Sequence, residues 1–230
     1  KSMPVAGTDK TMADMKEADF NFACPLDMTN ISLNWDTKFI EDYWKTGELP
    51  ELWYKNTRQA LSSAEPGFSF NFFENENETL RNACTEVTSE DDSDVCNLGS
   101  LNMSRIEDIK DFAQCTELAT KFLICGTMKA ELPFDKVYKV REKNRRLGLG
   151  LMGMHEWLLQ RKQPYEVTEE MHRWLYIYKS VSDKVAKESA DELGVSRRVK
   201  IRANAPTGSI GILAATTTGD ESLFAVSYMR

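Results

Sequence analysis

Histidine is scarce in this sequence: the 230 residues include only His155 and His172. Both lie in stretches with helical periodicity, and we expect both to be structural. A thiol hydrolase or transferase that used Cys84 as its nucleophile would need a histidine within hydrogen-bond reach of the thiol. That activity stays open as an alternative, and the position of the two rings decides it.

Long apolar runs and an excess of basic residues are also missing. No run approaches the roughly eighteen apolar residues of a membrane helix, and residues 1–19 lack the apolar region of a secretory signal. The net charge of −7 disfavours a general nucleic-acid surface, which requires a basic stripe. A single nucleotide is still an acceptable ligand, because a helix N-terminus binds phosphate locally. We therefore expect a cytoplasmic protein without nucleic-acid or membrane partners.

The chain has five cysteines, an odd number, and no CxxC pair. This usage disfavours both a disulfide framework and a zinc site, so we expect no metal and normally reduced thiols. Cys115 and Cys125 lie on the apolar stripe of a predicted helix and are expected in the core, and Cys24 is expected to be structural as well. Cys84 and Cys96 lie in polar, non-periodic sequence, where packing gives no reason for a thiol. Either of these two is a candidate functional residue.

Strand and helix patterns alternate along the chain, which favours an α/β fold. Residues 1–23 show weak periodicity and are predicted to be loop. Further on, the patterns predict strands over 28–35, 68–72 and 145–153, and helices over 37–44, 51–61, 107–128 and 168–193. In the helix over 107–128 one apolar stripe is predicted to face the core, namely Ile109, Phe112, Cys115, Leu118, Phe122 and Cys125.

The stretch 81–106, RNACTEVTSEDDSDVCNLGSLNMSRI, brings two thiols, an amide and a carboxylate into close order. Asn82, Cys84 and Glu86 are spaced by two, so in an extended segment their side chains would point to the same side. An amide can orient a hydroxyl, a carboxylate can accept its proton, and a thiol can act as a nucleophile or transfer a hydrogen atom. The alternative is an ordinary polar turn at the surface.

Two runs of like charge are each predicted to be solvated. The acidic residues within 89–94 are typical of a hairpin tip, and the basic run 141–146 is typical of a helix end. A metal site formed by Asp91, Asp92 and Asp94 is the alternative for the acidic run, although EF-hand spacing is absent.

The segment NAPTGSIG, residues 204–211, has the composition of a tight turn that opens a helix. Pro206 sets the turn, Gly208 permits close backbone approach, and Thr207 and Ser209 offer hydroxyls. Backbone N–H groups at such a helix start can bind a phosphate. The segment is not a Walker A loop, because no lysine follows the second glycine. The same residues also suit an ordinary helix cap.

Four segments occur here in the order found in one enzyme family: NACTE, then CNLGSLN with its cysteine twelve residues on, then RRLGLGLMG, then APTGSIGILAATTTG. Together they resemble the catalytic subunit of ribonucleotide reductases, over residues 22–230. The resemblance is strongest to the adenosylcobalamin-dependent (class II) enzymes, and the class with a separate di-iron subunit (class I) is the rival. It implies part of a ten-stranded α/β barrel with a radical-cysteine loop inside. Residues 1–230 are accordingly expected to be a fragment, the central to C-terminal part of one barrel domain.

By this resemblance the chain belongs to an oxidoreductase, a ribonucleoside-diphosphate reductase, that makes 2′-deoxyribonucleotides for DNA synthesis. Cys84 corresponds to the cysteine that becomes a thiyl radical and removes the 3′ hydrogen of the ribose. Glu86 would take the 3′-OH proton, Asn82 would hydrogen-bond the sugar, and Cys96 would be half of a dithiol that ends as a disulfide. The residues implied to bind substrate are Asn82, Ala83, Cys84, Thr85, Glu86, Pro206, Thr207, Gly208, Ser209 and Ile210, the last five at the phosphates.

The resemblance also implies adenosylcobalamin as the radical initiator, a thioredoxin-type, glutaredoxin-type or dithiol reductant, and a homodimer formed through parts outside this sequence. The sequence departs from the family pattern at two places. The partner of the Cys96 position lies much further upstream in the family, so Cys24 is not assigned that role. Ser222 stands where a proline is expected, although Glu221 beside it is kept. A nucleotide-binding module without turnover is the remaining alternative.

Overall fold

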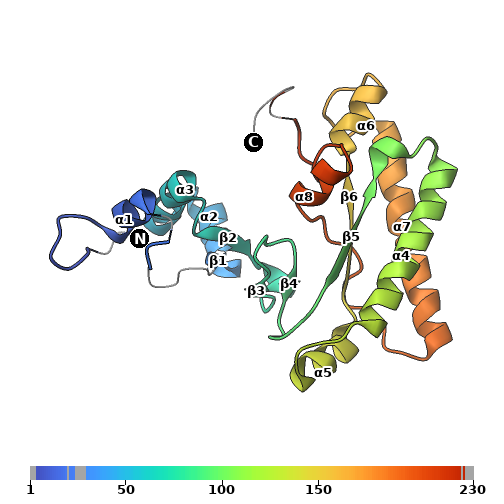
Figure 1. Ribbon diagram of the computed structural model, residues 1–230, viewed down its shortest axis with the longest axis horizontal. Helices are drawn as coiled ribbons and strands as arrows, with labels where there is room; N and C mark the ends of the chain where they lie inside the picture. The colour runs from blue at the N-terminus through green and yellow to red at the C-terminus, as the bar shows by residue number, and fades with distance from the viewer. Residues whose placement is uncertain (1–3, 20, 24–29, 224, 226–230) are drawn as a thin grey trace. The chain divides into compact units, whose positions relative to one another are not determined.

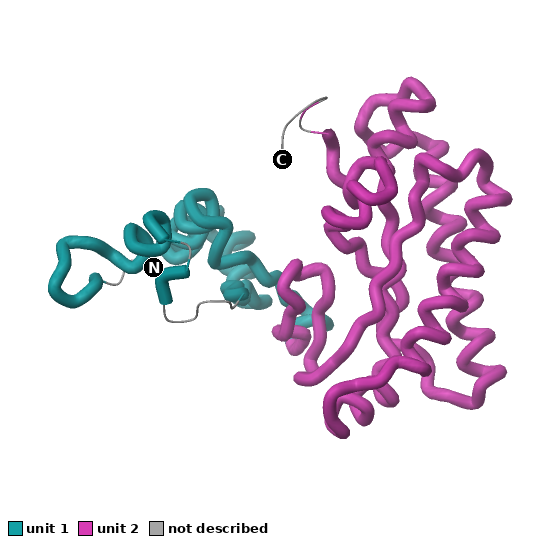
Figure 2. Tube along the Cα trace, in the orientation of Figure 1, with its two compact units in different colours: residues 1–76 teal, residues 77–230 magenta. Residues whose placement is uncertain are grey.

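The computed structural model describes residues 4–19, 21–23, 30–223 and 225, which form two compact units, Lys1–Glu76 and Asn77–Arg230 (Figure 2). The predicted α/β class is confirmed. Cys24 and the first two residues of the predicted strand over 28–35 lie outside the described residues. None of the described helices is long and apolar enough to cross a membrane.

The first unit is built on a pair of parallel strands joined by two helices. Its elements are α1 (Met12–Ala18), β1 (Ser32–Trp35), α2 (Thr37–Thr46), α3 (Glu51–Ser63), β2 (Gly67–Phe70) and the short 3-10 helix η1 (Phe73–Asn75). Asp36 caps α2, because its carboxylate accepts from the N–H of Phe39 at 2.9 Å. Gly47, with a φ of 70°, ends the same helix. The strands and helices predicted here are confirmed, with small shifts at their ends.

Aromatic side chains join the strands of this unit to its helices. The ring centroid of Trp35 lies 4.5 Å from that of Phe39 and 5.1 Å from that of Trp53. Phe68 of β2 lies 5.2 Å from Trp53. These contacts are tilted or edge-on, which is the geometry that the quadrupoles of aromatic rings favour.

The prediction of loop for residues 1–23 is wrong at α1. Thr11 and Asp14 cap this helix reciprocally: the Thr11 hydroxyl accepts from the N–H of Asp14 at 3.2 Å, and the Asp14 carboxylate accepts from the N–H of Thr11 at 2.7 Å. The cap stabilises a helix of only 7 residues. Such a helix is too short for hydrophobic periodicity to predict.

The second unit has parallel strands covered by two long helices. Its elements are β3 (Leu80–Arg81), β4 (Thr88–Ser89), β5 (Asn97–Asn102), η2 (Met103–Arg105), α4 (Ile109–Lys129), α5 (Asp135–Asn144), β6 (Leu147–Met152), α6 (Met154–Gln160), α7 (Glu169–Leu193) and α8 (Gly208–Leu213). β5 and β6 pair in parallel, and residues 200–203 run along the other edge of β6. α4 and α7 lie side by side against these strands (Figure 1). Within the described residues the strands do not close into the implied ten-stranded barrel.

β6 is buried along its whole length, and its glycines make room for the chain on both sides. A Cβ on Gly148 would lie 2.4 Å from a methyl carbon of Leu98 and 2.9 Å from the sulfur of Cys96. A Cβ on Gly150 would lie 2.7 Å from the carbonyl oxygen of Ala203. Both glycines therefore permit close backbone approach. The glycine-punctuated strand predicted here is confirmed.

The long helix α4 is confirmed, but the face predicted to be buried is wrong. Phe112 is fully buried, whereas Phe122 is 76% exposed and Cys125 is exposed. The residues that α4 does bury are Phe112, Thr116, Thr120, Leu123, Ile124 and Thr127. The predicted core role of Cys125 is therefore wrong, while Cys115 is half-buried against the core.

α4 can bury threonines because their hydroxyls are satisfied within α4 itself. The hydroxyl of Thr116 donates to the carbonyl of Phe112 at 2.8 Å, and that of Thr120 donates to the carbonyl of Thr116 at 2.7 Å. The hydroxyl of Ser182 on α7 donates in the same way to the carbonyl of Tyr178 at 2.7 Å. No polar group is then left unsatisfied where the two helices meet.

Candidate functional site

The predicted amide, thiol and carboxylate lie on a tight turn between β3 and β4, not on an extended segment. Thr85 has a positive φ of 66°, and its N–H donates to the carbonyl of Asn82 at 3.0 Å. The side-chain oxygen of Asn82 also accepts from the N–H of Val87 at 3.1 Å, across the base of the turn. The expectation that Asn82, Cys84 and Glu86 point to one side through extended backbone is therefore wrong. The Cys84 thiol is exposed at this turn.

Glu86 and Cys96 line one small cavity of about 130 Å³, together with Arg146 and Lys200. One carboxylate oxygen of Glu86 is buried and has no hydrogen-bond partner within the described part of the chain. A buried acceptor without a partner is costly, so this oxygen is suited to accept from a ligand. The structure therefore places a carboxylate and a thiol against the same space, although Cys84 does not line it.

Burial raises the pKa of Cys96 to about 12, with further contributions from the charges of Asp94 and Glu86 that Arg146 counteracts. Since the thiolate is the reactive form, this raised pKa leaves very few Cys96 thiols reactive at pH 8. We expect alkylation of Cys96 by iodoacetamide to be slow at pH 8 and to rise about tenfold per pH unit up to pH 10. Mass spectrometry of peptide 82–105 in a Cys84→Ser background measures this rate, and a rate that is flat with pH would contradict it.

Cys96 also lines a second cavity, of about 340 Å³. Asn82 and Val87 of the turn line it, and so do Leu98 of β5 and the acidic run. Asn82, Glu86 and Cys96 are therefore brought together around two adjoining cavities. Cys84, the remaining member of the predicted set, lies on the same turn and faces outward.

The acidic run and the basic run bind each other, and this contact removes part of each run from solvent. Nε of Arg146 donates to the Asp94 carboxylate at 2.8 Å, and both side chains are buried. The Asp91 carboxylate accepts from Lys143 at 2.8 Å and from Asn144 at 2.9 Å. The prediction of solvated runs is therefore wrong at Asp94 and Arg146, whereas Glu90, Asp92 and Lys143 are exposed as predicted. Within the described residues no group of acidic, histidine or cysteine side chains could hold a metal ion, so the metal-site alternative has no support.

The predicted phosphate turn opens α8, but its threonine does not cap that helix. Thr207 is buried with a positive φ of 53°, and its hydroxyl accepts from the N–H of Gly219 at 2.7 Å. The ordinary side-chain cap is thereby ruled out at Thr207. Ser209 and Ile210 are exposed at the first turn of α8. The Thr207 hydroxyl therefore accepts no hydrogen bond from the N–H groups of that first turn.

A cluster of hydrogen bonds at the ends of β5 and β6 holds the loop that follows α8. The Thr216 hydroxyl donates to the Glu156 carboxylate at 2.6 Å, and its oxygen lies 3.3 Å from the side-chain oxygen of Asn102. Ser104 joins the same cluster at 3.0 Å from Thr216. A Cβ on Gly153 would lie 2.3 Å from the Asn102 oxygen, and its φ of 72° also favours glycine. Sequence reasoning missed these residues, which come from three separate segments.

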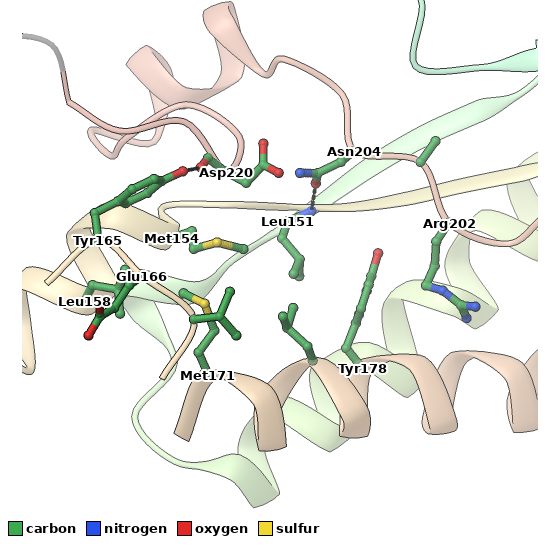
Figure 3. A pocket seen from close by; sticks show the side chains of 13 residues that line it. Leu151, Met154, Leu158, Tyr165, Glu166, Met171, Tyr178, Arg202, Asn204 and Asp220 are labelled. Atoms are coloured by element: carbon green, nitrogen blue, oxygen red, sulfur yellow. Dashed lines mark hydrogen bonds between the residues drawn. The ribbon is translucent and has the colours of Figure 1, made fainter. Parts of the chain in front are cut away.

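A larger and mainly apolar cavity, of about 630 Å³, lies between β6, α7 and residues 202–204 (Figure 3). Tyr178 rises from α7, and its hydroxyl donates to the carbonyl of Leu149. Burial raises the pKa of this phenol. Across the cavity, the side-chain oxygen of Asn204 accepts from the N–H of Leu151 at 2.9 Å. None of the predicted thiol-site residues lines this cavity, so it lies outside the candidate site.

Neither histidine acts on Cys84. Nδ1 of His155 accepts from the N–H of Leu223 at 2.7 Å, and its ring packs edge-on against Tyr165. His172 is exposed on α7. Among the described residues no hydrogen bond joins either ring to the thiol, so the hydrolase alternative lacks its base.

Comparison with known proteins gives one consistent result. The family model described as "Ribonucleotide reductase, barrel domain" matches residues 38–191, which lie in both compact units. A vitamin B12-dependent ribonucleoside-diphosphate reductase from Thermoplasma acidophilum is 29% identical over 211 residues, covering 78% of this chain and 28% of that protein.

Two solved structures share the fold. The class Id ribonucleotide reductase alpha subunit of Actinobacillus ureae superposes with a TM-score of 0.69 at 20% identity, covering 84% of this chain and 43% of that one. A B12-dependent (class II) ribonucleotide reductase superposes with a TM-score of 0.66 at 16% identity, covering 83% and 30%. The chain thus spans less than half the length of each of these relatives.

Proposed function

This chain belongs to the ribonucleotide reductase family, in its barrel domain, and from that premise we propose that it serves the reduction of ribonucleotides to 2′-deoxyribonucleotides by thiyl-radical chemistry. One observation carries the proposal: a single turn exposes Cys84 and sets the buried Glu86 carboxylate in one cavity with the Cys96 thiol. Both compact units would belong to one barrel domain, completed by chain that the longer relatives possess.

Each side chain of the turn has a distinct task in the proposed reaction. A thiyl radical on Cys84 removes the 3′ hydrogen atom of the ribose, and the Glu86 carboxylate accepts the 3′-OH proton. Asn82 hydrogen-bonds the sugar, while the backbone of Ala83 and Thr85 lines the nucleoside site. The 2′-OH leaves as water.

Cys96 supplies the reducing electrons together with a second thiol from outside this chain. The two S–H groups deliver two hydrogen atoms, so the balanced change is ribonucleotide plus dithiol to deoxyribonucleotide, water and disulfide. The hydrogen first taken by Cys84 returns to the 3′ carbon. A dithiol or a small redox protein of the thioredoxin or glutaredoxin type then reduces the disulfide again.

Adenosylcobalamin is the proposed cofactor, and when bound it supplies the initiating radical. The exposure of Cys84 fits this role, since a group held outside the turn can reach the thiol. The name of the Thermoplasma relative favours this cofactor. The runner-up is a radical from a separate metal-containing subunit, as in class I enzymes.

We place the substrate phosphates at Pro206, Thr207, Gly208, Ser209 and Ile210. The first turn of α8 offers backbone N–H groups without a side-chain cap, and Gly208 keeps the approach open. The Thr207 contact to Gly219 would keep the turn in shape. We further propose a cytoplasmic enzyme that forms a homodimer through segments outside this chain.

The decisive experiment measures deoxyribonucleotide formation by the longer protein that contains this chain. Labelled ribonucleoside diphosphate and triphosphate are each incubated with dithiothreitol, in the presence of adenosylcobalamin, of a metal-containing partner subunit of the class I type, or of neither. We expect product only with the cofactor. Product that requires a metal-containing partner subunit would keep the reaction and overturn the cofactor. No product under any of these conditions would overturn the proposed function in favour of a nucleotide-binding module.

A further inference from the structure

Asp94 and Arg146 form a buried ion pair that the proposed reaction does not use. Their side chains are 7% and 5% exposed, and Nε of Arg146 lies 2.8 Å from the Asp94 carboxylate. The same carboxylate oxygen accepts from the Ser89 hydroxyl at 2.8 Å and from the Asn144 amide at 3.0 Å. The desolvation of two buried charges often exceeds their mutual attraction. Stability alone is therefore a weak reason for this pair.

Arg146 is also the cation beside Cys96. Both residues line the 130 Å³ cavity that contains the Glu86 carboxylate. The thiol itself is held against β6, where a Cβ on Gly148 would lie 2.9 Å from the sulfur. The positive charge of Arg146 favours the Cys96 thiolate, whereas the charges of Asp94 and Glu86 oppose it.

We propose that Asp94 and Arg146 are positioning residues for Cys96. Asp94 holds the guanidinium on the cavity wall and offsets its charge, and the balance between the two charges adjusts how readily the buried Cys96 forms a thiolate. The inference rests on the proposed function only for the redox role of Cys96. Because the thiolate is the form that attacks a disulfide and leaves from one, this balance would govern how fast Cys96 is reduced again.

The other cations at this cavity have partners of their own. Lys200 lies 3.4 Å from the Glu78 carboxylate, and Arg202 lies 2.5 Å from the Asp183 carboxylate. Arg146 differs because its partner belongs to the same loop as the thiol, between β4 and β5 and two residues before Cys96. A change at Asp94 is therefore expected to reach Cys96 through Arg146.

The test is the alkylation rate of Cys96 by iodoacetamide at pH 8, read by mass spectrometry on the complete chain. In a Cys84→Ser background the tryptic peptide 82–105 contains Cys96 as its one thiol. We expect Asp94→Asn to accelerate alkylation at least tenfold, because the Arg146 charge is then unopposed. Adding Arg146→Met to Asp94→Asn should return the rate to within about threefold of the parent, because the cation is gone.

Controls separate this electrostatic role from a clamp that only holds the loop. Asp92 lies in the same loop as Asp94, and Asp92→Asn breaks its exposed contact to Lys136 of α5. This variant should leave the alkylation rate of Cys96 unchanged. Equal acceleration in Asp94→Asn and in the double variant would overturn the proposal, and so would an unchanged rate in Asp94→Asn. Circular dichroism checks folding. If Asp94→Asn unfolds, Arg146→Lys is measured in its place. The retained positive charge should keep the alkylation rate of Cys96 within threefold of the parent. A tenfold change in that rate would refute the proposal.

Alkylation needs neither nucleotide nor cofactor, so its outcome is independent of the reductase assay. The expected rate pattern without any deoxyribonucleotide product would keep the Asp94–Arg146 inference and reject the proposed function. Deoxyribonucleotide formation without the expected rate pattern would keep the proposed function and reject the Asp94–Arg146 inference.

Discussion

Replacement of Cys84 by serine is expected to lower deoxyribonucleotide formation by the longer protein at least about a thousandfold, which corresponds to about 4 kcal/mol in the activation barrier. The two side chains have nearly the same shape, and Cys84 is exposed on its turn, so the fold should not change. The chemistry differs because an O–H bond is stronger than an S–H bond. A serine therefore cannot carry the radical that removes the 3′ hydrogen.

The matched control for this change is Cys125→Ser. Cys125 is also an exposed free thiol, but it lies on α4 and lines neither of the two cavities at Cys96. Its activity is expected to match that of the unmodified protein, and nucleotide affinity is expected to stay within twofold in both variants. Full turnover by the Cys84→Ser variant would contradict the thiyl mechanism and favour a binding module without turnover.

Local signals in the sequence were sufficient for most of the helices. The helix α2 begins after its N-cap Asp36 and ends before Gly47, as the cap rules predict. In the same way α7 begins after Thr168 and ends before Gly194. Such signals act over a few residues, so a single sequence contains them in full. β5 had no signal of this kind, because its small and polar residues, NLGSLN, owe their extended form to pairing with β6.

Long-range pairing explains why the prediction of solvated charge runs failed at Asp94 and Arg146. Asp94 and Arg146 are 52 residues apart in sequence, yet each removes the other from solvent. A run of like charge predicts solvation only while its partner is unknown. The same limit applied to the candidate site: the residue types at Asn82, Glu86 and Cys96 were recognised, but the turn that arranges them depends on the Asn82 side chain bonding the Val87 backbone.

The phase of α4 was mistaken because apolar residues occur on two of its faces. Counting apolar residues favoured a stripe that includes both Phe112 and Phe122, whereas the helix buries threonines that satisfy their own hydroxyls. Phe112 packs against Trp174 of α7 with ring centroids 4.8 Å apart. Phe122 is 76% exposed. The two phenylalanines therefore offer a direct test of which face holds the second unit together.

Phe112→Ala is expected to lower the free energy of unfolding of the second unit by about 3–5 kcal/mol, since it removes a fully buried ring and leaves a cavity. Phe122→Ala on the same helix should change it by less than about 0.5 kcal/mol. Hydrogen exchange of peptides from α4 and α7, read by mass spectrometry, measures both values within this unit alone. Equal losses in the two variants would mean that the apolar stripe of the sequence, and not the threonine face, packs against α7. A large loss for Phe112→Ala alone would identify α4 and α7 as the rigid support on which β5, β6 and the Cys96 thiol are held.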